Sequence, residues 1–161
     1  MTAAPRGVLE ACPLFEGLPR EALEELALGA SLRAVRAGET IIREGEEGDT
    51  LFVIAEGRVR TDKRTPSGDP WTVRFYEKGG VFGEVSLLDR VRRSATVVAE
   101  TDGTVLVIER ERFLAFGDRH PAAGLVVTRR LAERLATRLR RANEDVVTLF
   151  SALVHEVERK L

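Results

Sequence analysis

The sequence predicts an α+β chain in which a β-barrel or sandwich, over residues 31–108, is flanked by helices on both sides. Three observations favour this class. Leucines recur at helical spacing until about Ala30. Short β-branched runs, separated by glycines and acidic clusters at intervals of about 8 to 12 residues, then follow. A long helical pattern without glycine or proline begins after Gly124.

Length and composition set limits on the function. With 161 residues, 43% of them hydrophobic, the chain is long enough for one domain with a proper core, and we expect a single domain over 1–161. A net charge of -1 gives no general attraction to nucleic acid or anionic lipid. Cys12 has no partner for an internal disulfide, and no apolar run is long enough to cross a membrane. We therefore expect a cytoplasmic protein.

The N-terminal segment 7–30 has the features of packed helices. Pro19 is placed where a first helical turn tolerates proline, and Leu23 and Leu26 recur on one face behind it. We expect this segment to pack against the barrel.

The strand region consists of short apolar runs joined by turns. The runs cover 40–43, 50–57, 58–62, 71–77 and 104–108. The acidic cluster Glu44–Asp49 lacks the alternation of a calcium loop, so we interpret it as a solvated turn in which Gly48 and Asp49 prepare the next strand. The loop 63–70 has the composition of a hairpin connection.

The C-terminal region, 109–161, should be helical. We expect one short helix over 109–116, ended by Gly117, and one helix of up to about 37 residues beyond Gly124. The long helix carries apolar residues at steps of four and three, a heptad seam formed by Leu135, Leu139, Ala142, Val146, Leu149 and Leu153. Such a seam favours a homodimer through this helix. The alternatives are an amphipathic helix that lies on its own domain, or an end that folds back.

The segment 79–99 contains the residues with the clearest chemistry. Its glycines at 79, 80 and 83 allow a sharp turn and close approach to a ligand, and Glu84–Leu88 fits a single helical turn. The free NH groups at the start of that turn, together with Arg93 and Ser94, suggest an anion site. Glu84 is not needed by a phosphate, so it suggests a ligand that also has a hydroxyl, as a ribose does.

At these residues the sequence resembles the cyclic nucleotide-binding domain family, and specifically its phosphate-binding cassette. Phe82-Gly83-Glu84, Leu87-Leu88 and Arg93-Ser94-Ala95 match the family pattern in order and spacing. The resemblance implies an eight-stranded antiparallel β-roll, a jelly-roll-like double sheet. It also implies that Arg93 pairs with the cyclic phosphate and that Glu84 accepts the ribose 2'-hydroxyl. The residues that we expect around the ligand are Val73, Val81, Phe82, Gly83, Glu84, Val85, Ser86, Arg93, Ser94 and Ala95.

The resemblance also indicates how the base is bound. The bacterial activators of the family touch the base from their long helix. With an insertion of about one helical turn, the corresponding positions here are 141–143, of which Asn143 has a suitable amide. Serine at position 94 does not decide between the nucleotides, because its hydroxyl can serve the phosphate or a guanine. The resemblance to the bacterial activators makes cyclic AMP the expected ligand, with cyclic GMP as the alternative. No other cofactor is expected.

Enzyme classes fit the sequence poorly. A metal-dependent enzyme of the double-sheet type needs two or three inward-facing histidines, and this chain has only His120 and His155, both on or beside expected helices. Ser86 and Ser94 have no nearby histidine to activate them, and Cys12 lies in the N-terminal segment. We therefore expect a non-enzymatic sensor that resembles catabolite activators without their DNA-binding domain, with an unidentified protein partner and no direct DNA or membrane binding. The alternatives are a ligand-free dimerisation module with a degenerate cassette and a truncated transcription regulator.

Overall fold

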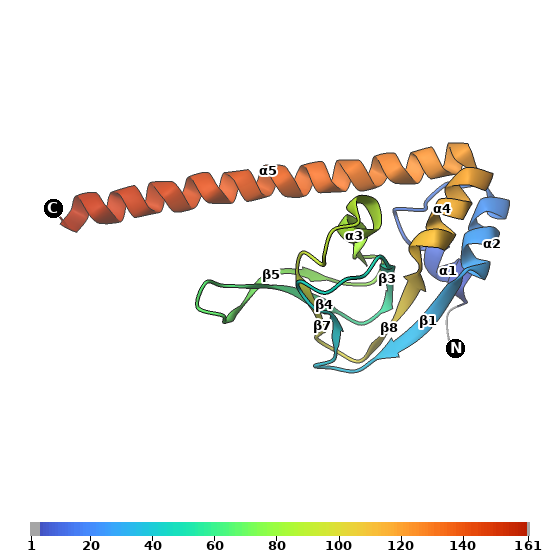
Figure 1. Ribbon diagram of the computed structural model, residues 1–161, viewed down its shortest axis with the longest axis horizontal. Helices are drawn as coiled ribbons and strands as arrows, with labels where there is room; N and C mark the ends of the chain where they lie inside the picture. The colour runs from blue at the N-terminus through green and yellow to red at the C-terminus, as the bar shows by residue number, and fades with distance from the viewer. Residues whose placement is uncertain (1–3, 161) are drawn as a thin grey trace. The chain divides into compact units, whose positions relative to one another are not determined.

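A computed structural model describes residues 4–160 and shows eight strands in two antiparallel four-stranded sheets (Figure 1). The first sheet has the order β1-β8-β3-β6 and consists of Ala30–Val35, Gly103–Ile108, Leu51–Glu56 and Val81–Phe82. The second has the order β2-β7-β4-β5 and consists of Thr40–Ile42, Thr96–Ala99, Val59–Arg64 and Pro70–Tyr76. The expected eight-stranded antiparallel β-roll is confirmed.

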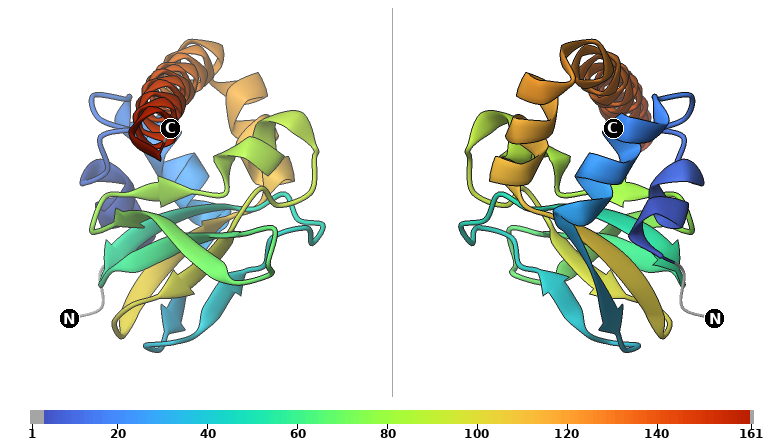
Figure 2. Two further views of the ribbon diagram at one scale, coloured as in Figure 1. Left: turned by 90° about the vertical axis from the view of Figure 1, so that its left-hand side faces the viewer. Right: turned by 90° about the vertical axis from the view of Figure 1, so that its right-hand side faces the viewer.

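The apolar side chains of the two sheets form the core. Figure 2 shows the ribbon of the two sheets from two further directions. Ile54, on β3, and Val97, on β7, belong to one buried cluster that draws on both sheets. Strand β3 is buried at five consecutive positions, because both of its faces are covered. Strand β5, at the edge of its sheet, is mostly exposed.

Within the part of the chain that the structure describes, five helices accompany the roll. They are α1 (Pro5–Glu10), α2 (Arg20–Leu28), α3 (Glu84–Asp89), α4 (Arg110–Arg119) and α5 (Pro121–Lys160). The first starts with proline at its first position and buries Val8 and Leu9, and the second buries Leu23 and Leu26, the leucines that the spacing predicts. Within residues 4–160, every helix is too short or too polar to cross a lipid bilayer.

The helix boundaries near residue 120 differ from those that the sequence suggests. Helix α4 continues through Gly117, and α5 begins at Pro121 and runs through Gly124, so the prediction that glycine ends the first helix was wrong. A Cβ on Gly124 would lie 2.8 Å from the Cα of Gly117. The two glycines therefore serve a close contact between α4 and the first turn of α5, and this packing outweighs their poor helix propensity.

By its contacts the chain divides into two compact units. The first extends to Leu125 and contains both sheets, and the second, from Val126, contains the remainder of α5. The candidate site described below lies in the first unit.

Candidate ligand-binding site

Gly83 joins β6 to α3 and fixes where that helix starts. It has the left-handed backbone conformation (φ 83°), which glycine adopts at no steric cost. A Cβ at this position would lie 2.5 Å from the backbone oxygen of Thr50. Both the conformation and the lack of space therefore require glycine here, and they bring the first turn of α3 close to β3.

A pair of stacked rings supports this junction. Strands β3 and β6 place Phe52 opposite Phe82. The two buried rings lie 4.9 Å apart, centroid to centroid, and are nearly parallel. The guanidinium carbon of Arg93 lies 5.9 Å from the centre of the Phe52 ring, near the outer limit of a cation–π contact. The stack is thus part of the wall behind Arg93.

Arg93 is held from both its backbone and its side chain. Its NH donates to the carbonyl of Glu46, and its carbonyl accepts from the NH of Gly45, each at 2.8 Å. Its Nη1 donates to the carbonyl of Thr50 at 3.0 Å and to that of Gly83 at 3.3 Å. Within residues 4–160, Nε and Nη2 have no hydrogen-bond acceptor. The guanidinium is therefore anchored on one side, and its Nε/Nη2 edge is left for another acceptor.

The burial and the charges around Arg93 describe the electrostatics of the site. Arg93 and Glu84 are both buried, with relative exposures of 7% and 6%. Burial lowers the pKa of Arg93, because the guanidinium loses hydration, while the carboxylates of Asp49 and Glu84 oppose this shift. Arginine nevertheless stays protonated in proteins. A fixed, partly desolvated cation with an open donor edge can bind an oxyanion in the bidentate manner of a guanidinium.

The structure places the predicted site residues in three groups. Gly83, Glu84 and Arg93 lie together, since Gly83 accepts a hydrogen bond from Arg93 and the charge of Glu84 acts on Arg93. The other cassette positions differ in burial: Val81, Phe82 and Ser86 are buried, Val85 and Ala95 are half-buried, and Ser94 is exposed.

The third group comprises Val73 and Asn143, which lie outside the cassette segment 79–99. Val73 is 55% exposed on the edge strand β5. Asn143 is exposed on α5, in the second compact unit. Their roles beside a base stay predictions.

Two residues at this site were not among those predicted from the sequence. A Cβ on Gly48 would lie 2.8 Å from Nε and 2.9 Å from Nη2 of Arg93, so Gly48 lines the open donor edge. Asp49 acts on the charge of Arg93. The only signal in the sequence was the Gly-Asp pair that ends the acidic turn, and we interpreted this pair as structural alone. The described residues contain no group of three or more side chains that could hold a metal ion.

Comparison with known proteins identifies the family. The family model described as "Cyclic nucleotide-binding domain" matches residues 32–120, more than half of the chain and including the whole cassette. The chain belongs to the cyclic nucleotide-binding domain family. A domain of this type is a ligand-binding regulatory module and is not itself catalytic.

The names of the relatives mention two different cyclic nucleotides. The "Cyclic AMP receptor protein" of Thermus thermophilus is 36% identical over 138 residues, which cover 86% of this chain and 62% of the relative. The human "cGMP-dependent protein kinase 2" is 37% identical over 110 residues, 67% of this chain and 14% of the kinase. The domain thus spans less than two thirds of the length of these relatives.

Solved structures support the same family and fold. The crystal structure of Thermus thermophilus catabolite activator protein matches with a TM-score of 0.75 at 36% identity, over 85% of this chain and 62% of that one. A cyclic nucleotide-binding domain from Methylobacillus flagellatus matches with a TM-score of 0.75 at 26% identity, over 87% of this chain and 79% of that one.

Proposed function

We propose that this domain binds a cyclic nucleotide, preferentially cyclic AMP, and acts as a non-enzymatic sensor. The observation that carries the proposal is the open Nε/Nη2 edge of the buried Arg93, beside the carboxylate of Glu84. A cyclic phosphate would accept two charge-assisted hydrogen bonds from that edge. Glu84 would accept the 2'-hydroxyl, and backbone NH groups near Gly83 and Ser94 would complete the phosphate site.

The remaining cassette residues have supporting roles in this proposal. Phe82 and Val81 would form the apolar floor of the site. Its rim would consist of Val85, Ser86 and Ala95. Val73 would face the base from β5. The preference for cyclic AMP rests on the bacterial relative, because the hydroxyl of Ser94 suits either nucleotide. The human kinase keeps cyclic GMP as the alternative.

Calorimetry with cyclic AMP, cyclic GMP and a cyclic dinucleotide tests this function. We expect the strongest binding with cyclic AMP and a loss of affinity of about a hundredfold in Arg93→Gln, because a bidentate charge-assisted contact disappears. Arg43→Gln is the matched control. It removes the same charge from the exposed side of the neighbouring turn, where Arg43 pairs only loosely, at 3.7 Å, with Glu46. Absence of binding heat at millimolar nucleotide, or equal affinities of both variants, would overturn the proposal.

The sensor would transmit its state through α5. In this proposal Asn143 contacts the base when α5 is docked, so the ligand favours the docked conformation and shifts the equilibrium towards it. We further propose that α5 pairs with α5 of a second copy, and that the signal reaches a protein partner in the cytoplasm and not DNA directly.

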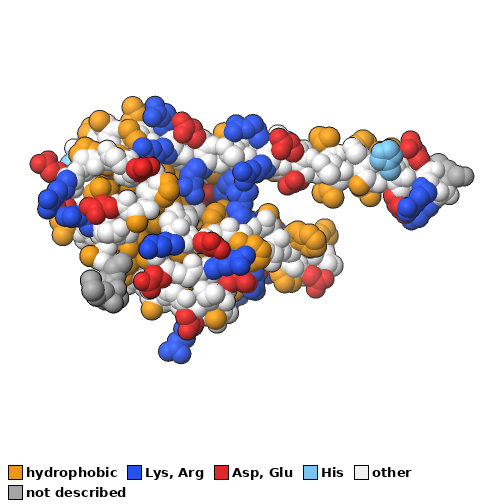
Figure 3. Space-filling model, turned by 180° about the vertical axis from the view of Figure 1, so that it is seen from behind, with side chains coloured by type: hydrophobic (Ala, Val, Ile, Leu, Met, Phe, Trp, Pro, Cys, Tyr) orange, Lys and Arg blue, Asp and Glu red, His pale blue; other side chains and the backbone are white. Residues whose placement is uncertain are grey.

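The heptad seam supports a homodimer. Its members Leu139, Val146, Leu149 and Leu153 are each more than 60% exposed in the single chain. Figure 3 shows hydrophobic side chains along this helix, interspersed with charged ones. Exposed apolar residues at steps of four and three favour a helix of the same kind as partner. The alternative function, a dimerisation module without ligand, would use the same seam. Only the calorimetry described above therefore distinguishes this module from a cyclic nucleotide sensor.

Light scattering tests the dimer with two variants on adjacent residues. Val146 is on the seam and Val147 is next to it, and both are 64% exposed. We expect Val146→Asp to convert a dimer into a monomer of 17.8 kDa, whereas Val147→Asp stays a dimer. A monomeric wild-type protein, or the same mass for both variants, would contradict the seam.

A further inference from the structure

A second cavity lies on α4, next to the cassette site, with which it shares Gly48 and Asp49. It has a volume of about 710 Å³ and is bounded by the turn at 47–49, the loop at 90–92 and the side chains of Arg110, Glu111 and Leu114. We call it the α4 cavity. None of the residues expected around the cyclic nucleotide lines it. Its volume is that of a pocket for a small organic molecule.

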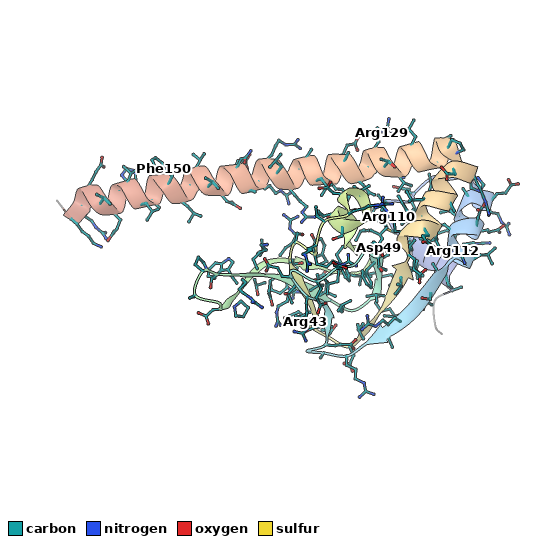
Figure 4. The ribbon with its side chains drawn as sticks, viewed as in Figure 1. Arg43, Asp49, Arg110, Arg112, Arg129 and Phe150 are labelled. Atoms are coloured by element: carbon teal, nitrogen blue, oxygen red, sulfur yellow. The ribbon has the colours of Figure 1, made fainter. Side chains whose placement is uncertain are left out.

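Arg110 lines the α4 cavity and has unused donors just below the cavity surface. Within the described chain, its Nε and Nη1 are buried and have no hydrogen-bond partner. Buried donors of this kind are rare in folded proteins, because their desolvation is not compensated. Figure 4 labels Arg110, at the start of α4, and Asp49, on the loop before β3, the two sides of the cavity.

Arg90, at the end of α3, also lines the cavity and carries a second guanidinium. It ends α3 with a left-handed backbone (φ 53°), the only non-glycine residue with positive φ among residues 4–160. Its NH donates to the carbonyl of Ser86 at 3.2 Å. The left-handed conformation disfavours a side chain, so an arginine there is more easily explained by a role of its guanidinium than by the backbone.

The three acids of the cavity do not satisfy these donors. Glu47 is 3.5 Å from Arg92, and the charge of Asp49 acts on Arg93, outside the cavity. Glu111 is exposed. With three guanidiniums and three carboxylates the lining has no net charge. The cavity must therefore select its ligand through placed donors and not through a general positive field.

The cavity also has an apolar side. Val91 and Leu114 line it and are 43% and 44% exposed. These two aliphatic side chains are nearly half exposed and lie in the same cavity as Arg110, whose donors are unsatisfied. The combination suits a ligand that has both an anionic head and an apolar body. We propose that the α4 cavity is a second binding site, distinct from the cyclic nucleotide site, for a small organic oxyanion, a phosphate or carboxylate attached to an apolar group.

Titration of the ¹⁵N-labelled protein with phenyl phosphate, benzoate, inorganic phosphate and phenol tests this site. We expect phenyl phosphate or benzoate to bind more tightly than inorganic phosphate, and phenol to bind least. The Nε–Hε signal of Arg110 and the amides of 90–92 and Leu114 should shift. The comparison of phenyl phosphate with benzoate shows which anionic head the site prefers.

Three variants locate the binding. Arg110→Gln should weaken binding of the preferred probe at least about tenfold, the loss of a charge-assisted hydrogen bond. Arg90→Gly should also weaken it, and it should fold, because glycine suits a positive φ. Arg112→Gln, on the same helix but outside the cavity lining, is the control and should bind normally.

The outcomes separate this site from the cassette. The α4 cavity is supported if the probe still shifts the NMR signals in Arg93→Gln but no longer does so in Arg110→Gln or Arg90→Gly. This result does not depend on whether cyclic nucleotides bind at the cassette. Shifts lost in Arg93→Gln alone would place the probe in the cassette and overturn the proposal. Absence of binding of every probe at millimolar concentration would overturn it as well.

Discussion

Replacing Gly48 by alanine probes the open edge of Arg93 without removing any group from the site. The added Cβ would lie 2.8 Å from Nε and 2.9 Å from Nη2 of Arg93, whereas ordinary contacts of a Cβ begin at 3.4 Å. The guanidinium therefore has to move by about 0.6 Å, the difference between these distances. The neighbour is the far end of a flexible side chain, so we expect the fold to accept the change.

The displacement should weaken nucleotide binding and leave stability nearly unchanged. A shift of about 0.6 Å takes a charge-assisted hydrogen bond from its usual length of about 2.8 Å to about 3.4 Å, beyond its effective range. Such a bond contributes about 1.5–3 kcal/mol, which corresponds to an affinity about ten- to a hundredfold lower. Calorimetry with cyclic AMP measures the affinity, and a thermal melt measures the stability.

The control is Glu46→Ala, which changes an exposed side chain two residues away in the same turn. Its backbone carbonyl still accepts the NH of Arg93, so we expect normal affinity. If Gly48→Ala melts like the wild type and binds cyclic AMP equally well, the ligand does not use the Nε/Nη2 edge, and the reasoning about this site is wrong.

Three further predictions concern stability. A hydrogen bond from His120 and, to a smaller extent, one from Arg119 lower the pKa of Glu25 in the folded state. These bonds therefore stabilise the fold at pH values above the unfolded-state pKa of about 4.3. The stabilisation is lost as the pH falls through the lower folded-state pKa. The difference in melting temperature between wild type and Glu25→Gln should therefore shrink from about pH 6 to about pH 3; a constant difference would contradict the coupling. Phe82→Ala should lower the free energy of unfolding by about 3–5 kcal/mol in urea, and a loss below about 1 kcal/mol would mean that the ring stack collapses without cost. In Gly124→Ala the new methyl group meets backbone, so we expect a loss of about 1–3 kcal/mol in the same assay, and an unchanged midpoint would show that α4 and α5 can separate here.

The sequence was sufficient for the roll, because the change of spacing is a local pattern, and it named Gly83, Glu84 and Arg93, which the structure places together. The change from helical to strand spacing near Ala30 predicts the first strand within one residue. The glycine interpretation failed at Gly117 and Gly124, where a contact between two helices overrides local propensity. A single sequence does not show that these two glycines meet.

The open edge of Arg93 was beyond sequence reasoning for a similar reason. The chemical types of Arg93 and Glu84, a guanidinium and a carboxylate, are enough to predict a ligand with an anionic group and a hydroxyl. Gly48 lies 45 positions before Arg93 and has the appearance of any turn glycine, so its contact emerges only when the two segments pair. The exposure of Val73 could not be predicted from the sequence either. The alternating pattern around Val73 is that of a strand with a buried face, yet β5 lies at the edge of its sheet and is mostly exposed.

The two hydrogen bonds between the backbone of Arg93 and the acidic turn have a consequence for mutational tolerance. They use only the NH of Gly45 and the carbonyl of Glu46, so the side chain at position 46 is free to vary without moving the guanidinium. Proline at position 45 is excluded, because it would remove the donor. A fluorescent reporter attached at position 46 would therefore be carried next to the ligand site while the anchor of Arg93 stays intact.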